Sequence, residues 1–123
     1  MKLICRACET EISREVNKLE DLSRLNDIDE QDYIPEGFYT IATKKSDLYS
    51  DLHKEGSIII NIKDLINSDF HSNGSRLNGC CGCDGLDGMN RVCSNNHEIG
   101  TEKSDCWMSH CIGLNPELVK LIP

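Results

Sequence analysis

The sequence predicts a small α+β protein, in which one N-terminal helix and a short antiparallel sheet are joined to a zinc-ribbon-like, cysteine-rich lobe. Three observations predict this class: an apolar stripe at helical spacing, two runs of β-branched and aromatic residues, and cysteines gathered near the C-terminus. With 123 residues, of which 38% are hydrophobic, the chain can bury a single modest core. We therefore expect one domain over residues 1–123, stabilised in part by metal.

The helix is predicted over Glu11–Asn26. Thr10 or Ser13 is its expected N-cap, because both side chains can accept a hydrogen bond from a free backbone N–H. Apolar side chains recur every three or four residues in this segment and would form one stripe on a helix: Ile12, Val16, Leu19, Leu22 and Leu25. We expect the stripe to pack against the core.

The sheet is predicted from two longer strands and several short ones. Phe38–Thr43 is rich in aromatic and β-branched residues, and the nearly continuous apolar run in Ser57–Ile62 indicates a strand buried on both faces. Shorter strands are predicted at Arg91–Cys93 and His97–Thr101, and Leu118–Ile122 closes the chain. We divide the domain into an α+β part (1–78), a metal lobe (79–111) and a C-terminal tail (112–123).

The N-terminus contains no apolar run of the length found in a signal peptide, and no segment approaches the roughly 20 apolar residues that span a bilayer. We therefore expect a cytoplasmic protein that does not interact with membranes. In that reducing compartment, eight cysteines indicate metal binding. Disulfide bonds remain the alternative if the chain is exported by another route.

Seven cysteines are candidate metal ligands: Cys5, Cys8, Cys80, Cys81, Cys83, Cys93 and Cys106. Two C-x-x-C turns, Cys5–Cys8 and Cys80–Cys83, can each bring two thiolates to one ion and together could close a four-thiolate site. Thiolate ligands favour zinc over hard cations, so we predict one or two zinc ions per chain. An iron–sulfur cluster and a redox dithiol fit the spacings less well.

Two histidines and the last cysteine are less certain. His97 follows Cys93 by four residues and His110 adjoins Cys111, so either imidazole could complete a site. Cys111 is expected to be a buried thiol. The spacings alone leave open which residues share an ion.

The C-terminal half resembles a signature of small bacterial cysteine-rich proteins that have no established activity. The residues that carry the resemblance are Gly79–Gly82, Asp84–Gly88, Asn90, Cys93 and Gly100–Trp107, which follow the pattern G-C-C-G-x-D-G-x-D-G-x-N-x-x-C and then G-T-E-x-S-D-C-W. The resemblance implies a shared fold. Because Cys83 departs from the pattern, the resemblance favours Cys80, Cys81, Cys93 and Cys106 as ligands.

The net charge of −8 argues against a nucleic-acid-binding protein, since phosphate contacts need clustered Lys and Arg. The acidic residues concentrate in one segment: Glu20, Asp21, Asp27, Asp29, Glu30, Asp32 and Glu36. This segment is either a solvated loop or a surface that meets a basic protein. The leading hypothesis is therefore a zinc-stapled binding protein that acts by protein–protein contact, as an immunity protein or antitoxin does.

Two other functions stay open. A zinc enzyme would need an open coordination position and a general base, for which Glu98, Glu102, Asp105 and His110 are the nearest candidates. The H-E-x-x-H and deaminase patterns are absent, which disfavours this alternative. A metal-sensing accessory protein is the third hypothesis, since exposed thiolates could tune the affinity for an ion.

Overall fold

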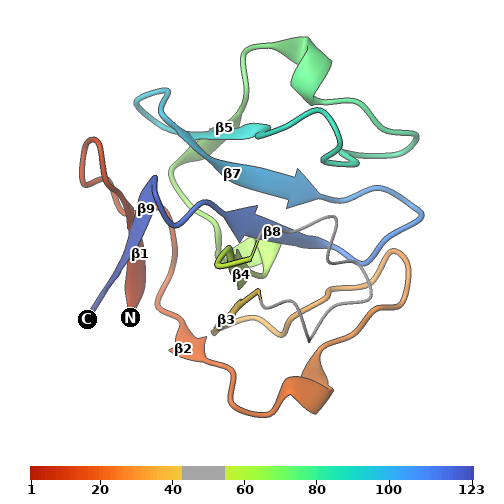
Figure 1. Cartoon of the computed structure of the whole chain (residues 1–123), viewed down its shortest axis with the longest axis horizontal. Coiled ribbons are helices and arrows are strands. Elements are labelled where there is room, and N and C mark those ends of the chain that lie inside the picture. The colour runs from red at the N-terminus through yellow and green to blue at the C-terminus, as the bar shows by residue number, and fades with distance from the viewer. Residues whose placement is uncertain (43–54) are drawn as a thin grey trace.

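The computed structural model describes residues 1–42 and 55–123, and the regular secondary structure of this part of the chain is mostly β-strand (Figure 1). The strands are β1 (Lys2–Cys5), β2 (Asn17–Lys18), β3 (Phe38–Ile41), β4 (Ile58–Ile60), β5 (Ser68–Phe70), β6 (Arg91–Cys93), β7 (Glu98–Lys103), β8 (Cys111–Leu114) and β9 (Val119–Ile122). Three single-turn 3₁₀-helices accompany them: η1 (Leu22–Arg24), η2 (Ile62–Asp64) and η3 (Gly74–Arg76).

The strands form two sheets. Seven strands make a mixed sheet in the order β2-β3-β4-β8-β7-β6-β5, in which β2 and β3 are parallel and the other neighbours are antiparallel. The remaining strands, β1 and β9, pair as a separate antiparallel ribbon, so the two ends of the chain lie side by side (Figure 1).

Strand β4 lies near the middle of the large sheet, and its side chains point to both faces of that sheet. Ile58 and Ile60 pack on one side with β1, β9 and the segment around Ile12, whereas Ile59 points to the other side with Leu19 and Ile34. All three isoleucines are buried, which confirms the predicted burial on both faces. Because successive side chains of a strand point to opposite faces, this one apolar run contributes to two hydrophobic clusters.

The predicted helix over residues 11–26 is wrong, and the described residues contain no α-helix. The first part of this segment is extended, because backbone groups there bond to partners outside the segment, and only Leu22–Arg24 forms a single 3₁₀ turn (η1). The Ile12 N–H donates to the Leu3 carbonyl, the Arg14 N–H to the Asp64 carbonyl and the Val16 N–H to the Met1 carbonyl. Burial of Ile12 and Val16 beside these partners outweighs the helical propensity of the segment, which contributes only a few tenths of a kcal/mol per residue.

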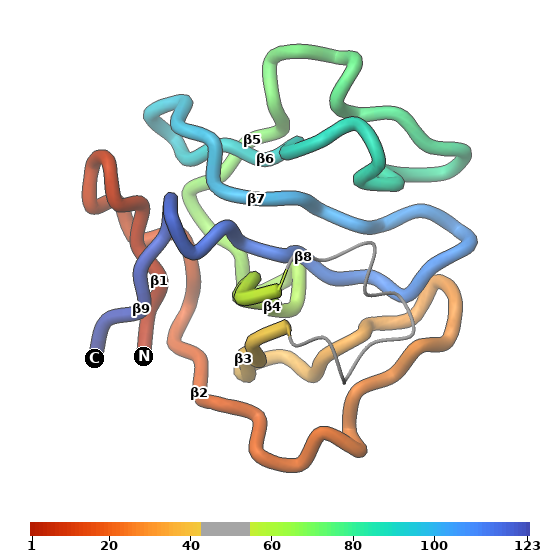
Figure 2. The backbone as a smooth tube through the Cα atoms, in the orientation of Figure 1, coloured from red at the N-terminus to blue at the C-terminus, as the bar shows by residue number. Residues whose placement is uncertain are grey.

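The α+β class and the zinc-ribbon-like lobe are also wrong. Strands β6, β7 and β8 are members of the seven-stranded sheet, so the cysteine-rich segment forms no lobe of its own (Figure 2). Among the other predicted strands, Phe38–Thr43 corresponds to β3, with Thr43 outside the described residues. The predicted strand at His97–Thr101 corresponds to β7, which begins at Glu98 and extends to Lys103.

Candidate metal centres

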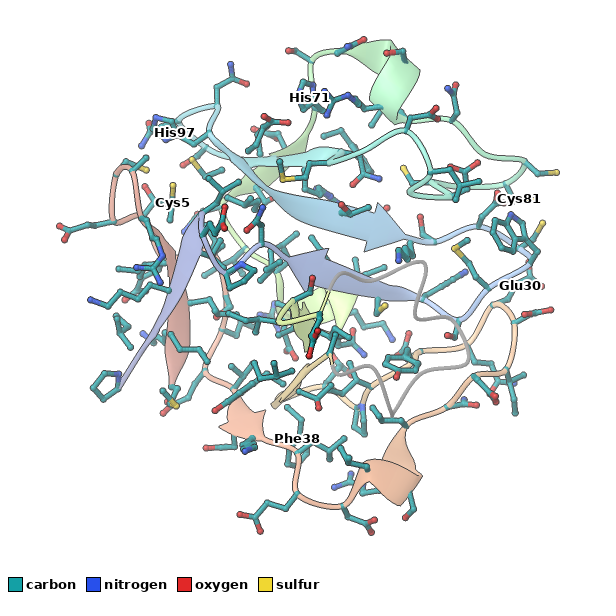
Figure 3. The ribbon with its side chains drawn as sticks, in the orientation of Figure 1. Cys5, Glu30, Phe38, His71, Cys81 and His97 are labelled. Atoms are coloured by element: carbon teal, nitrogen blue, oxygen red, sulfur yellow. The ribbon has the colours of Figure 1, made fainter. Side chains whose placement is uncertain are left out.

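Four residues from two segments that are far apart in the sequence converge at one end of the sheet. Cys5 ends β1, Cys8 follows in the next turn, Cys93 ends β6 and His97 immediately precedes β7. Their ligand atoms all lie within 4.8 Å of one another, and we call this group the N-terminal cluster. Figure 3 shows Cys5 and His97 on the same side of the molecule.

Three distances between these atoms are close to those of a tetrahedral site. The Sγ atoms of Cys8 and Cys93 are 3.7 Å apart, and the Nδ1 atom of His97 lies 3.4 Å from Cys93 Sγ and 3.8 Å from Cys5 Sγ. A tetrahedral zinc ion, with Zn–S bonds of about 2.3 Å and Zn–N bonds of about 2.0–2.1 Å, holds its ligand atoms about 3.5–3.8 Å apart. The residues present therefore fit a metal ion.

Two tight turns face each other across the N-terminal cluster. In the first, the Glu9 N–H donates to the Cys5 carbonyl (2.7 Å), and Glu9 itself adopts a positive φ of 59°. In the second, the Cys93 N–H donates to the His97 carbonyl (2.8 Å), and Asn96 adopts a φ of 66°. Each turn presents two side chains to the same point, as the knuckles of structural zinc sites do.

The thiols of the N-terminal cluster differ in their environments. Side-chain hydrogen bonds from Asn95 and Thr10 lower the pKa of Cys8 to about 5, so this residue is a thiolate at neutral pH. Burial raises the pKa of Cys5 instead. Metal binding uses the thiolate form, so a bound positive ion would favour deprotonation of Cys5.

A second group, which we call the trithiol cluster, consists of Cys80, Cys81 and Cys106. Their sulfur atoms lie within 4.8 Å of one another, and the Sγ atoms of Cys80 and Cys81 are 3.8 Å apart. Cys80 and Cys81 are exposed and Cys106 is partly buried. Mutual interaction raises the pKa of Cys106 to about 12, chiefly through its hydrogen bond with Cys81. The cluster contains three ligands and faces solvent.

The carboxylate of Asp105 accepts hydrogen bonds from the backbone that carries the trithiol cluster. Its Oδ1 atom accepts the N–H groups of Cys81 (2.9 Å) and Cys106 (2.8 Å), and its Oδ2 atom accepts Cys80 N–H and Trp107 Nε1–H, both at 3.0 Å. Asp105 is 1% exposed, and these bonds hold its pKa far below the usual range, with those from Cys81 and Cys80 contributing most. It therefore fixes the backbone that carries all three thiols.

Two glycines permit the close packing of this loop. A Cβ atom on Gly79 would collide with the Gly82 carbonyl and would lie 2.9 Å from Asp105 Oδ2. A Cβ atom on Gly82 would collide with the Ser104 carbonyl. The approach of the loop to the end of β7 thus requires glycine at both positions.

The structure separates the two C-x-x-C turns that the sequence pairs. Cys5 and Cys8 join Cys93 and His97, whereas Cys80 and Cys81 join Cys106, and the two clusters lie on opposite sides of the view in Figure 3. Six of the seven predicted cysteine ligands therefore fall into two groups.

Cys83 and Cys111 belong to neither group. Cys83 is 6% exposed and lies beside β7, where its N–H donates to Ser104 Oγ (3.1 Å). Cys111 is buried in the core with Ile59 and Ile34, as expected of a buried thiol. The sequence alone left open whether His97 is a metal ligand. The feature that could have indicated it is its position four residues after Cys93, across a turn.

The groups considered as general bases are engaged elsewhere. Glu98 pairs with Arg76 (3.2 Å), Glu102 pairs with Arg91 (2.7 Å), and Asp105 accepts the four N–H groups described above. His110 lies with Nε2 3.0 Å from the Asp105 carbonyl oxygen. Each of these side chains has a structural partner.

The fold and its sites define an almost all-β, cysteine-rich protein with two side-chain clusters that could each hold a metal ion. No family model, curated protein or solved structure matches the chain. The resemblance of residues 79–107 to bacterial cysteine-rich proteins stays a prediction. Within residues 1–42 and 55–123, no helix has the length and apolar character needed to cross a bilayer.

Proposed function

We propose that this is a zinc-stapled binding protein, in which zinc at the N-terminal cluster stabilises the fold and an acidic surface contacts a basic protein. The observation that carries the first part is the convergence of Cys5, Cys8, Cys93 and His97 from two distant segments. Three sulfurs and one imidazole nitrogen are a common ligand set of structural zinc sites. Hard cations prefer oxygen ligands, so this set favours zinc over calcium or magnesium.

A structural role is supported by the number and burial of the ligands. Four protein ligands complete a tetrahedral sphere, whereas a catalytic zinc normally keeps one position for water or substrate. Cys5 and Cys93 are each 1% exposed, which further limits access. Thiolates persist only where they are not oxidised, which is consistent with the cytoplasm as the compartment.

Metal analysis tests the structural part. We expect the protein purified without added metal to carry at least one zinc by mass spectrometry. Cys93→Ser should lose one equivalent and unfold at lower temperature, because folding and metal binding are coupled. Cys83→Ser is the matched control, since Cys83 is also buried but lies outside both clusters. A fully folded wild-type chain without metal would contradict the proposal.

The binding part is supported by the acidic turn at residues 27–30. Asp27, Asp29 and Glu30 are exposed, and the Glu30 N–H donates to the Met108 carbonyl (2.9 Å). This bond places the turn next to Trp107, which is 44% exposed. An exposed tryptophan beside negatively charged side chains is suited to binding a basic protein. Tryptophan is often a main contact in protein interfaces, and opposite charge speeds association.

Charge neutralisation tests the binding part on a basic protein encoded by an adjacent gene. We expect Asp29→Asn with Glu30→Gln to slow association with that protein and to weaken its salt dependence. Asp69→Asn with Glu117→Gln removes the same charge from exposed positions on β5 and before β9 and should change association less. Asp32 is left intact because it pairs with Lys63 at 3.2 Å. Equal effects of the two double variants would overturn the surface assignment.

A further inference from the structure

We propose that the trithiol cluster is a second metal site, which binds a thiophilic metal ion through Cys80, Cys81 and Cys106 and keeps one coordination position open to solvent. This site is independent of zinc at the N-terminal cluster. It assigns the chain an exchangeable ion in addition to a structural one.

The donor set defines the class of ion. The cluster contains three cysteine sulfurs within 4.8 Å, and the 3.8 Å between Cys80 Sγ and Cys81 Sγ suits two thiolates on one ion. Soft thiolates alone select ions such as Cu(I), Zn(II) or Cd(II) over hard cations. The ligand is therefore a thiophilic metal ion.

The nearest carboxylate is occupied, which leaves the fourth position without a ligand from Asp105. Both oxygens of Asp105 accept N–H groups, two on Oδ1 and two on Oδ2. This carboxylate therefore serves as a positioning group beneath the thiols. By fixing the backbone at Cys80, Cys81 and Cys106, it holds the three sulfurs together before an ion arrives.

The exposure of the two clusters differs, and the difference predicts different exchange rates. Cys80 and Cys81 are exposed, whereas Cys5 and Cys93 of the N-terminal cluster are buried. An incoming chelator or thiol can bind an ion at its open position before the protein thiolates leave. Exchange at the trithiol cluster should therefore be faster than at the N-terminal cluster.

Trp107 provides a local reporter of this site. It is the single tryptophan of the chain, it follows Cys106, and its indole N–H donates to Asp105 (3.0 Å). Binding of an ion to the trithiol cluster should change the fluorescence of Trp107. The N-terminal cluster lies on the other side of the molecule and should affect this signal little (Figure 3).

The test uses the reduced, zinc-loaded full chain and Cd(II) as the probe, under anaerobic conditions. We expect native mass spectrometry to show one zinc and one cadmium per chain, with thiolate-to-metal absorption and a change in Trp107 fluorescence. A chelator should remove the cadmium at least tenfold faster than the zinc.

Three variants locate the second ion. Cys106→Ser should lose the cadmium and the fluorescence change but keep the zinc, and Cys83→Ser should keep both ions. Cys93→Ser should lose the structural zinc and still bind at the trithiol cluster, so failure of one site is distinguishable from failure of the other. The thermal unfolding of each variant verifies that it is folded. A wild-type chain that binds a single ion, or Cys106→Ser that binds both, overturns the proposal.

Discussion

The sulfur atoms of Cys8 and Cys93 lie 3.7 Å apart although 85 positions separate the two residues. Cys8 belongs to the turn after β1, and Cys93 ends β6 of the large sheet. The contact therefore joins the β1–β9 ribbon to the seven-stranded sheet at a point where no strand pairing connects them. A metal ion at this point would fix the position of both chain ends.

Removal of the metal should release the β1–β9 ribbon before the rest of the fold. A chelator strong enough to empty the N-terminal cluster should increase hydrogen exchange in Lys2–Cys5 and the following turn, because that segment loses its cross-link to β6. The central strands β4 and β8 should stay more protected, since they pair within the large sheet. Equal loss of protection throughout the chain would contradict a local role for the ion.

A second prediction concerns the ion pair of Arg91 and Glu102. Arg91 Nη2 lies 2.7 Å from Glu102 Oε1, the two side chains are only 15% and 6% exposed, and Arg91 also stacks on Phe70. Arg91→Met should reduce the free energy of unfolding by about 3–5 kcal/mol, because it leaves a buried carboxylate without its counter-ion. Denaturant unfolding measures the loss.

The exposed pair of Lys63 and Asp32 is the matched control. Its side chains are 62% and 44% exposed, so Lys63→Met should cost less than about 1 kcal/mol. The double variant Arg91→Met with Glu102→Met should recover part of the loss, since neither charge then remains buried. If Arg91→Met costs no more than Lys63→Met, the buried pair does not stabilise the fold.

A third prediction concerns Asp105→Asn and pH. The low folded pKa of Asp105 means that its ionised form is stabilised by folding, so its contribution is complete above the unfolded value near pH 4 and is lost as the pH falls through the folded value. Asp105→Asn should therefore lower the unfolding temperature at pH 7. The difference from wild type should shrink in strong acid, as thermal scans at several pH values can show. A difference that does not change with pH would exclude the charge as its cause.

A fourth prediction concerns Gly79→Ala. The added Cβ would collide with the Gly82 carbonyl and crowd Asp105, so the loop must move and the trithiol cluster should bind Cd(II) more weakly. Gly74→Ala is the control, because no atom lies within 4 Å of its added Cβ. We expect that variant to change stability by less than about 0.5 kcal/mol and Cd(II) binding not at all. Equal Cd(II) affinities of the two variants would contradict the packing role of Gly79.

The strands were predictable where composition alone decides them. The run Ile58–Ile60 is apolar and β-branched, a composition typical of buried strands, and it forms one. The turn between Cys93 and His97 was also visible, because Ser94, Asn95 and Asn96 favour turns. The segment from Glu11 to Asn26 was not predictable in this way. Its apolar spacing is compatible with a helix, but its first residues bond to the distant carbonyls of Leu3, Asp64 and Met1 and are extended.

The sequence by itself determined the chemistry of this protein: eight cysteines, a thin apolar core, a net charge of −8 and the residues able to bind a soft ion. The tertiary structure decided the grouping of those residues. Spacing along the chain pairs Cys5–Cys8 with Cys80–Cys83, but the packing of the β1–β9 ribbon and of the loops against the large sheet places Cys93 and His97 beside the first turn and Cys106 beside Cys80 and Cys81. A metal site depends on distances of a few ångströms between side chains, and here those distances are set by tertiary contacts between segments that are remote in sequence.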